Sequence, residues 1–254
     1  MTIPEPAAND FSPCWSRPEP AASFRRRLFC FPFAGGGAAI FRPWRSALPR
    51  DVEVIGVQLP GREGRFREPL FKAMAPLVEQ LAEAIQPLFD RPVTFFGHSA
   101  GALMAFELAR TMEANWGLRL ERLIIGGCNP PHLQSPLNYS LHHLPDAELV
   151  DAMRKLNGTP QVIFDDPELM QLFLPVVRAD IGLAETYACP AGAKLGCPIT
   201  ALWGERDGHT SREAVQRWSE LTGKEFSMRV VNGDHFFPAT NREETVAVIG
   251  EVMG

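Results

Sequence analysis

The stretch Phe95-Phe96-Gly97-His98-Ser99-Ala100-Gly101 decides the fold, because it places a G-x-S-x-G motif between an apolar run and a helix. Apolar side chains recur at helical spacing over residues 103–109. A serine on a sharp strand-to-helix turn needs residues almost free of side chains two positions before and after it. Gly97 and Gly101 fill these positions, so we expect Ser99 to project from the turn as a nucleophile. A chance pentapeptide in a surface turn is the alternative, and the strand and helix patterns around it argue against that.

A serine hydroxyl is too weak an acid to attack unaided, so the chain must also supply a base and a group that orients the base. Asp207 comes just after a predicted strand at residues 199–204, and His235 comes just after another at residues 226–231. The order serine, aspartate, histidine along the chain is that of the α/β-hydrolase fold. We therefore predict a catalytic triad of Ser99, Asp207 and His235.

Other histidines and acids compete for these roles. His98 is fixed in the turn beside the serine, so its ring is expected to point elsewhere. Asp234 adjoins the chosen histidine and so points away from it. Glu205 stays open as the acid, because it lies close to Asp207 along the chain. The remaining histidines are in segments typical of loop or helix surface: His132, His142, His143 and His209.

The first predicted strand, at residues 27–33, runs into a glycine-rich loop, Ala34-Gly35-Gly36-Gly37-Ala38. Consecutive glycines let backbone N–H groups approach a substrate closely, as an oxyanion hole requires. We predict that the N–H groups of Ala34 and Ala100 are its donors. A phosphate-binding loop is the alternative, but no Lys-Ser/Thr pair follows and the spacing differs from that of a P-loop.

Strand and helix patterns alternate along most of the chain. Strands are predicted at residues 52–57, 93–96 and 123–127, and an amphipathic helix at about residues 73–89. Such alternation is typical of a mostly parallel sheet flanked by helices. We therefore expect an α/β-hydrolase fold in one domain, residues 1–254, of a length that such a fold commonly has.

The pattern changes between residues 130 and 188, where strand signals give way to turns and helical runs. An insertion of that length without structure is improbable, so we predict a helical lid over the site. Its apolar side chains serve either core packing or contact with an acyl chain, and the sequence leaves both open. Pro175-Val176-Val177-Arg178 interrupts the helical pattern and is interpreted as a hinge. The helical runs are residues 146–156, 167–173 and 174–187.

Composition restricts the partners and the compartment. The net charge of −5 argues against nucleic acid as a partner, since phosphate binding needs basic clusters. No apolar run approaches the roughly 18 residues of a membrane span, and residues 1–23 read as a loose tail without a signal-peptide pattern. The five cysteines are an odd number and two of them lie in apolar, strand-like stretches, which fits a reducing compartment. We expect a cytoplasmic monomer without a metal ion or cofactor of its own.

Motifs from about residue 26 to the end occur in an order typical of one family. They are Cys30-Phe31-Pro32-Phe33-Ala34-Gly35-Gly36-Gly37, Phe41, Trp44, Gln58-Leu59-Pro60-Gly61-Arg62-Glu63, the serine motif, Arg178-Ala179-Asp180, Glu185-Thr186-Tyr187, Trp203-Gly204 with Asp207, and Gly233-Asp234-His235-Phe236-Phe237. In these motifs the sequence resembles the stand-alone type II thioesterases that accompany nonribosomal peptide and polyketide synthases. Phe33 departs from the pattern, because many members carry histidine there; the backbone donors are unaffected.

The resemblance implies hydrolysis of an acyl thioester on the phosphopantetheine arm of an acyl or peptidyl carrier protein, which clears stalled or wrongly loaded chains. A generic carboxylesterase, lipase or peptidase would use the same triad, so the triad alone does not separate these activities. A catalytically inactive hydrolase fold that serves as a binding protein is the second alternative. The presence of all three types of triad residue argues against it.

The resemblance also implies an acidic partner, because the carrier proteins of such systems are generally acidic. Arg62, Arg65 and Arg67 follow the Gln58-Leu59-Pro60-Gly61 turn and are the first candidates for a basic docking surface. A local basic cluster can steer an acidic partner even on a protein that is negative overall. The alternative is that these arginines are solvated or pair with neighbouring acids, Glu63 and Glu68.

Overall fold

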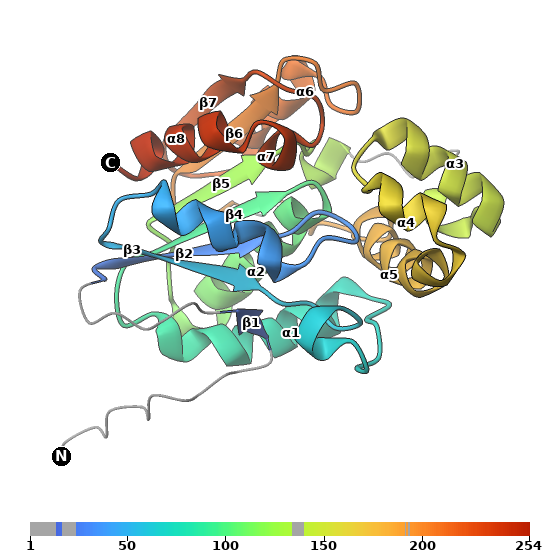
Figure 1. The fold of residues 1–254 in the computed structure, drawn as a ribbon. Helices are drawn as coiled ribbons and strands as arrows, with labels where there is room; N and C mark the ends of the chain where they lie inside the picture. Colours follow the sequence, from blue (N-terminus) through green and yellow to red (C-terminus); the bar gives the residue numbers. More distant parts are fainter. Residues whose placement is uncertain (1–13, 17–23, 134–139, 191, 193) are drawn as a thin grey trace.

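The strands of this chain form one sheet with helices on both faces (Figure 1). The computed structural model describes residues 14–16, 24–133, 140–190, 192 and 194–254. The strands are β1 (Trp15–Ser16), β2 (Arg26–Phe31), β3 (Val52–Val57), β4 (Val93–His98), β5 (Arg122–Gly126), β6 (Ile199–Gly204) and β7 (Phe226–Val231). Within the described residues their order is β1-β3-β2-β4-β5-β6-β7, and all neighbours pair in parallel except β1 with β3.

Side chains alternate along the central strands so that both faces of the sheet are buried. In β2, Phe29 and Phe31 pack into the core on one face, while Leu28 and Cys30 pack into the core on the other. Parallel strands covered on both faces read as nearly continuous apolar runs, which is the pattern found in the sequence. The predicted architecture, a mostly parallel sheet flanked by helices, is confirmed.

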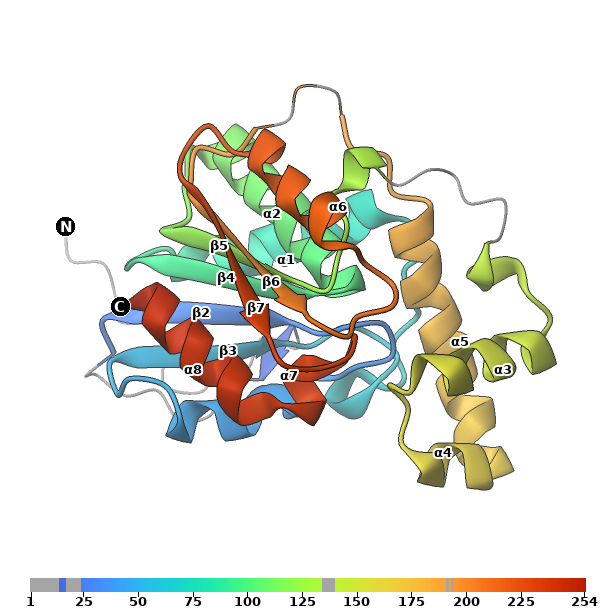
Figure 2. The same cartoon turned by 90° about the horizontal axis from the view of Figure 1, so that it is seen from above.

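The helices divide between the two faces of the sheet (Figure 2). Helices α1 (Met74–Ile85) and α2 (Ala100–Trp116) cover one face, and α8 (Arg242–Met253) covers the other. In the described part of the chain, no helix combines the length and apolar character needed to cross a membrane. Shorter elements are η1 (Ala38–Ser46), η2 (Glu63–Arg65), η3 (Gln86–Leu88), η4 (Pro131–Leu133), η5 (Leu141–His143), α6 (Arg212–Gln216), η6 (Arg217–Leu221) and α7 (Phe237–Thr240).

A helical segment lies beyond the carboxyl ends of the strands, as both views show (Figures 1 and 2). It consists of α3 (Asp146–Leu156), α4 (Gln161–Asp165) and α5 (Pro167–Glu185), which we call the cap helices. They fall within the helical insertion predicted at residues 130–188, of which residues 134–139 lie outside the described residues. The cap helices have a small apolar core of their own, which includes Leu149, Met153, Leu174 and Val177.

The N-terminal region differs from the loose tail predicted at residues 1–23. Trp15 and Ser16 form β1 and pair antiparallel with Val57 and Gly56 of β3. Cys14 is 4% exposed, and its carbonyl accepts a hydrogen bond of 2.8 Å from the N–H of Gln58. The edge of β3 offers unpaired backbone groups, and this short strand satisfies some of them. The other residues of the predicted tail lie outside the described residues.

The hinge predicted at Pro175-Val176-Val177-Arg178 is wrong, because α5 continues through these residues. Two predicted runs, 167–173 and 174–187, are therefore one helix. Pro175 lacks an N–H and leaves the carbonyl of Gln171 without its usual partner within the helix. The ring of Pro175 is on an exposed position, so the helix is held by the buried residues on either side, Leu174 and Val176.

Replacing Pro175 should therefore stabilise the protein. Pro175→Ala restores a helical N–H and should raise the free energy of unfolding by about 1–3 kcal/mol, after the greater entropy of the unfolded chain is subtracted. Urea denaturation followed by circular dichroism measures the change. Gln171→Ala, at an exposed position of the same helix, is the control and should change stability by less than about 0.5 kcal/mol. A less stable Pro175→Ala variant would contradict this view of α5.

Candidate active site

Ser99 occupies a strained turn between β4 and α2. Its φ of 53° and ψ of −121° lie outside the regions that ordinary side chains adopt. A Cβ at Gly97 would lie 2.3 Å from the carbonyl oxygen of Gly101. A Cβ at Gly101 would lie 2.4 Å from the carbonyl oxygen of Phe31. Both glycines are therefore required by close backbone contacts, and they hold the serine at the end of the strand.

The structure brings together Ser99, His235 and Asp207, which come from three different loops. The Oγ of Ser99 lies 3.2 Å from Nε2 of His235. The Nδ1 of His235 lies 3.1 and 3.0 Å from Oδ1 and Oδ2 of Asp207. With the ring proton on Nδ1, His235 donates to the carboxylate and its Nε2 accepts from the serine hydroxyl. This is the arrangement in which a histidine can remove a proton from a serine.

Asp207 is held as an anion by several donors. Its Oδ1 accepts hydrogen bonds from the N–H of His209 at 2.8 Å and of Thr210 at 3.3 Å, and its Oδ2 accepts from the Thr210 hydroxyl at 2.8 Å. Burial alone would raise the pKa of Asp207, but the hydrogen bond and charge of His235, with those backbone and hydroxyl donors, lower the pKa to about 2. The carboxylate is therefore charged at neutral pH and faces the imidazole.

The competing acids do not occupy this position. Glu205 is exposed, and its carboxylate pairs with Arg206 at 2.9 Å. Asp234 accepts a hydrogen bond from the N–H of Phe236 at 2.9 Å and turns away from the neighbouring histidine, as its position in the sequence predicts. Asp207 is the acid that the structure places against His235.

His98 lies buried beneath His235 and supports the loop that carries it. Its Nε2 is 2.7 Å from the carbonyl oxygen of His235, so Nε2 carries the proton and donates it. Its ring also packs edge-on against Phe33 and Phe237. Burial, and then the proximity of His235, lower the pKa of His98 to about 3. The ring is therefore neutral at pH 7, and its Nε2 bonds the backbone of His235 while the Ser99 hydroxyl pairs with the His235 ring.

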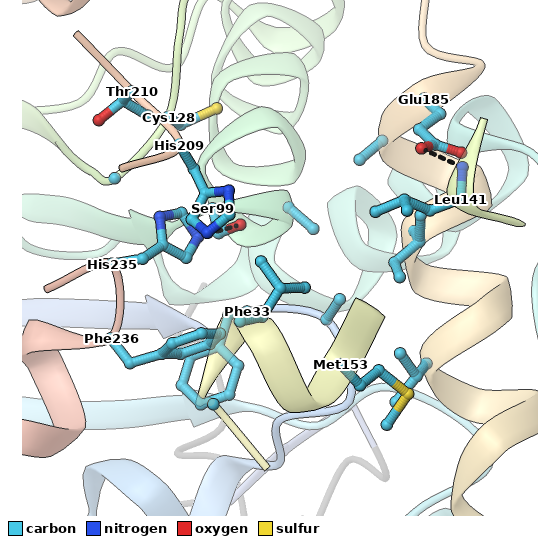
Figure 3. Close-up of a pocket in the computed structure, with 18 of the residues that line it drawn as sticks. Phe33, Ser99, Cys128, Leu141, Met153, Glu185, His209, Thr210, His235 and Phe236 are labelled. Atoms are coloured by element: carbon cyan, nitrogen blue, oxygen red, sulfur yellow. Dashed lines mark hydrogen bonds between the residues drawn. The ribbon is translucent and has the colours of Figure 1, made fainter. Parts of the chain in front are cut away.

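A cavity of about 590 Å³ opens onto Ser99 and His235 (Figure 3). Its volume lies within the range of cavities that hold small-molecule ligands. Glu185 and Leu141 lie across the cavity from the serine, where the carboxylate accepts a hydrogen bond of 2.9 Å from the N–H of Leu141. The wall beside the serine contains Phe33, Ala34, Ala100, Cys128 and Phe236, and the cap helices contribute Met153, Leu156, Val177, Ile181 and Ala184.

The predicted oxyanion donors come from two different segments that border the cavity. Ala34 follows β2, and Ala100 begins α2, where the first N–H groups of a helix have no partner within the helix. Both residues line the cavity beside Ser99. In the described part of the chain, no group of three or more histidine, cysteine or acidic residues is arranged to hold a metal ion.

Two of the three arginines predicted as a docking surface are buried. Arg62 is 8% exposed and pairs with Asp180, and Arg65 is 2% exposed and pairs with Glu68 at 2.6 Å. These two arginines therefore pair with acids, as the alternative interpretation states. Arg65 pairs with its neighbour Glu68, whereas Arg62 pairs with the distant Asp180 and not with Glu63. Arg67 is exposed. A basic docking surface at residues 62–67 is therefore not supported.

Two histidines line the cavity that the sequence patterns do not identify as site residues. His209 was expected at the surface, but its ring centroid is 5.1 Å from that of His235. His143 comes from η5 and lines the cavity beside the cap helices. His209 follows the predicted acid by two residues, and this proximity is the signal that could have identified it. His143 gives no such signal, because only the tertiary packing of the insertion brings it there.

Comparison with known protein families gives a match over almost all of the described chain. The model of the thioesterase domain matches residues 26–252. The chain belongs to the thioesterase family. Its predicted resemblance is thereby confirmed at the level of the family, and its parallel sheet with flanking helices is the α/β-hydrolase fold of its structural relatives.

Individual relatives of this thioesterase cover nearly the whole chain. It is 40% identical to linear gramicidin dehydrogenase LgrE of Brevibacillus parabrevis, over 93% of this chain and 90% of that protein. It is 39% identical to gramicidin S biosynthesis protein GrsT of Aneurinibacillus migulanus, over 87% and 86%. Among solved structures, the type II thioesterase BorB from the borrelidin biosynthetic cluster has a TM-score of 0.83 and 34% identity, over 94% of this chain and 96% of that one.

The buried imidazole of His98 should make the thioesterase sensitive to acid. The pKa of about 3 lies below the ordinary histidine value of 6.5, so the unfolded chain binds a proton that the folded protein excludes. The titration of His98 therefore leaves the free energy of unfolding unchanged above pH 6.5. Below that pH it lowers the free energy of unfolding by up to roughly 1.4 kcal/mol per pH unit as the pH drops toward 3. His98→Gln retains an N–H donor and should show a shallower loss.

Urea denaturation at pH 7, 6, 5 and 4 measures this difference. The free energy of unfolding of the wild-type protein should approach, or fall below, that of His98→Gln as the pH falls. Parallel curves for the two proteins would show that His98 does not titrate with the depressed pKa described above.

Proposed function

We propose that this thioesterase is a serine hydrolase that cleaves acyl thioesters, with Ser99 as nucleophile, His235 as general base and acid, and Asp207 as the group that orients the imidazole. The observation that carries this proposal is the continuous chain of contacts from the Ser99 hydroxyl through both ring nitrogens of His235 to the Asp207 carboxylate. Membership of the thioesterase family supports the proposal that the bond cleaved is the carbon–sulfur bond of a thioester.

The first half of the reaction transfers the acyl group to the enzyme. Oγ of Ser99 attacks the thioester carbonyl carbon while Nε2 of His235 takes the hydroxyl proton. Asp207 stabilises the imidazolium that forms, and it keeps the ring in the orientation in which Nε2 faces the serine. The carbon–sulfur bond then breaks, and the imidazolium returns the proton to the leaving thiolate. The products are an acyl-serine and a free thiol.

The second half repeats these steps with water. His235 removes a proton from water, which attacks the acyl-serine carbonyl, and the imidazolium then protonates Oγ of Ser99 as the carboxylic acid leaves. In both halves a negative charge develops on the carbonyl oxygen. We propose that the N–H groups of Ala34 and Ala100 stabilise it, since both residues line the cavity that Ser99 also lines.

The substrate is proposed to be an acyl chain on the phosphopantetheine arm of a carrier protein, and the enzyme to remove stalled or wrongly loaded chains from a nonribosomal peptide or polyketide synthase. The relatives GrsT and BorB support this, because their names place them in biosynthesis of gramicidin S and of borrelidin. The cavity supports it as well: the apolar residues of the cap helices, Met153, Leu156, Val177 and Ile181, form a wall that an acyl chain can contact. We propose that the cap helices act as the lid.

The relative LgrE is named a dehydrogenase, and many dehydrogenases bind a nicotinamide dinucleotide. The glycine-rich loop after β2 does not suit that chemistry. Its residues Gly35, Gly36 and Gly37 are followed by Ala38, Ala39 and Ile40, so the third glycine of the dinucleotide-binding pattern is missing. The residues that surround the cavity favour hydrolysis, and no cofactor enters the proposed reaction.

Replacement of the nucleophile tests the proposed chemistry. Ser99→Ala should lower hydrolysis of an acyl-pantetheine thioester by at least roughly 10³-fold, because no acyl-serine can form. Release of the free thiol with a chromogenic reagent gives the rate. Ser46→Ala removes an exposed serine hydroxyl far along the chain and should retain the wild-type rate.

The same assay with a matched oxygen ester separates a thioesterase from a general carboxylesterase. The wild-type protein should have the higher kcat/KM for the thioester. Faster hydrolysis of the oxygen ester would favour the carboxylesterase, and full activity of Ser99→Ala would remove the serine from the mechanism.

The identity of the acid is tested by two amide substitutions. Asp207→Asn should lower kcat by roughly 10³- to 10⁴-fold, because an amide favours the tautomer in which Nε2 cannot accept the serine proton. Glu205→Gln is the matched control, and its effect should be small, since Glu205 is exposed and pairs with Arg206. The reverse ranking would assign the acid role to Glu205.

A further inference from the structure

One face of the cap helix α5 is pressed against the loop that carries Ala34. Phe173, Val177 and Asp180 follow one another at helical spacing along this face. A Cβ at Gly35, whose φ is +78°, would lie 2.7 Å from Cγ2 of Val177 and 2.8 Å from Cζ of Phe173. The loop therefore approaches α5 as closely as a residue without a side chain allows.

Asp180 joins this loop to α5 by a direct hydrogen bond. Its Oδ2 accepts the N–H of Gly35 at 2.8 Å, and the residue is only 2% exposed. The next N–H back along the chain is that of Ala34. Because the peptide plane between Ala34 and Gly35 is rigid, fixing the N–H of Gly35 also fixes the carbonyl of Ala34 and restricts the orientation of the Ala34 backbone.

Arg62 completes the arrangement from the loop after β3. Its Nη2 donates to Oδ1 of Asp180 at 2.8 Å, its Nη1 donates to Oδ2, and Nη1 also lies 3.1 Å from the carbonyl oxygen of Gly36. The guanidinium thus contacts both the carboxylate on α5 and the backbone of the glycine-rich loop. A buried carboxylate is costly unless it is paired, and this pair is held in two-point geometry.

We infer that Asp180, with Arg62, is a positioning residue for the oxyanion hole, and that the cap helix α5 sets the conformation of the loop that supplies the Ala34 N–H. This inference rests on the proposed role of Ala34. Asp180 is outside the group of residues that line the cavity, so it acts through the loop and not on the substrate. Hydrolysis therefore depends on the position of α5 as well as on the triad.

Asp180→Asn is the sharpest substitution, because both carboxylate oxygens are acceptors here. An amide has one oxygen, so whichever way it turns, its NH₂ faces the N–H of Gly35 or the guanidinium of Arg62. We expect kcat for a small acyl thioester to fall about 10- to 100-fold, with KM changed less than about twofold, because misplacing an oxyanion donor affects the transition state. Arg62→Lys, which loses the two-point contact, should act in the same direction.

Glu53→Gln is the matched control. Glu53 and Arg27 form another buried pair, in which Nε of Arg27 donates to the carboxylate at 2.7 Å, within β2 and β3 and away from the oxyanion loop. This variant should lose stability as Asp180→Asn does, while its kcat, measured at a temperature where all variants are folded, should stay near the wild-type value.

An alkyl trifluoromethyl ketone gives a readout that a loss of stability does not change. It forms a tetrahedral adduct with the active-site serine, so its inhibition constant reports binding of the oxyanion. For Asp180→Asn and Arg62→Lys this constant should rise in proportion to the loss in kcat. If both variants behave like Glu53→Gln in kcat and in the inhibition constant, the inference is wrong. If Asp180→Asn does not fold, the same two measurements on Arg62→Lys test the inference. Activity in Ser99→Ala would instead overturn the proposed function.

Discussion

The close approach of three backbone segments around Ser99 is the constraint on which the rest of the site depends. Gly97 and Gly101 let the end of β4 and the start of α2 pass each other and the carbonyl of Phe31, leaving no room for a methyl group. The strained conformation of the serine is stable only because the buried strands and α2 on either side hold it. In the proposed mechanism, the other groups of the site act on the hydroxyl that this turn presents.

The parallel arrangement of the strands brings the other residues of the site together, and it places no special demand on the residues of the core. Because β2 to β7 all point in the same direction, the loops after β2, β4, β6 and β7 meet at one edge of the sheet. His235, Asp207 and the glycine-rich loop therefore meet there although they are far apart in sequence. The core beneath can then be selected for packing and the loops for chemistry.

The sequence predicted what depends on local patterns and missed what depends on long-range packing. The bounds of β3, β6, β7 and α3 agree with the predicted runs, because periodicity reports burial directly. Trp15–Ser16 escaped prediction because two residues carry no period, and α5 was divided at Pro175 because the local rule for proline ignores the buried residues that hold the helix. The burial of Arg62 depends on its pairing with Asp180, more than a hundred residues away, and no local pattern in the sequence predicts that pair.

Under the proposed function, the position of Asp180 on α5 limits how the acyl specificity of this enzyme can change. A helical insertion at the open end of a sheet looks like a module that could be exchanged freely to alter the acyl cavity. Here the same helix carries the carboxylate that binds Gly35, so exchanging the whole segment would remove a hydrogen bond that holds the glycine-rich loop. Changes at Met153, Leu156 and Ile181, which face the cavity, leave that support in place. The proposed function therefore predicts that single substitutions on the cap helices alter acyl specificity with less loss of rate than exchange of the whole segment, because they keep the register of α5 against the glycine-rich loop.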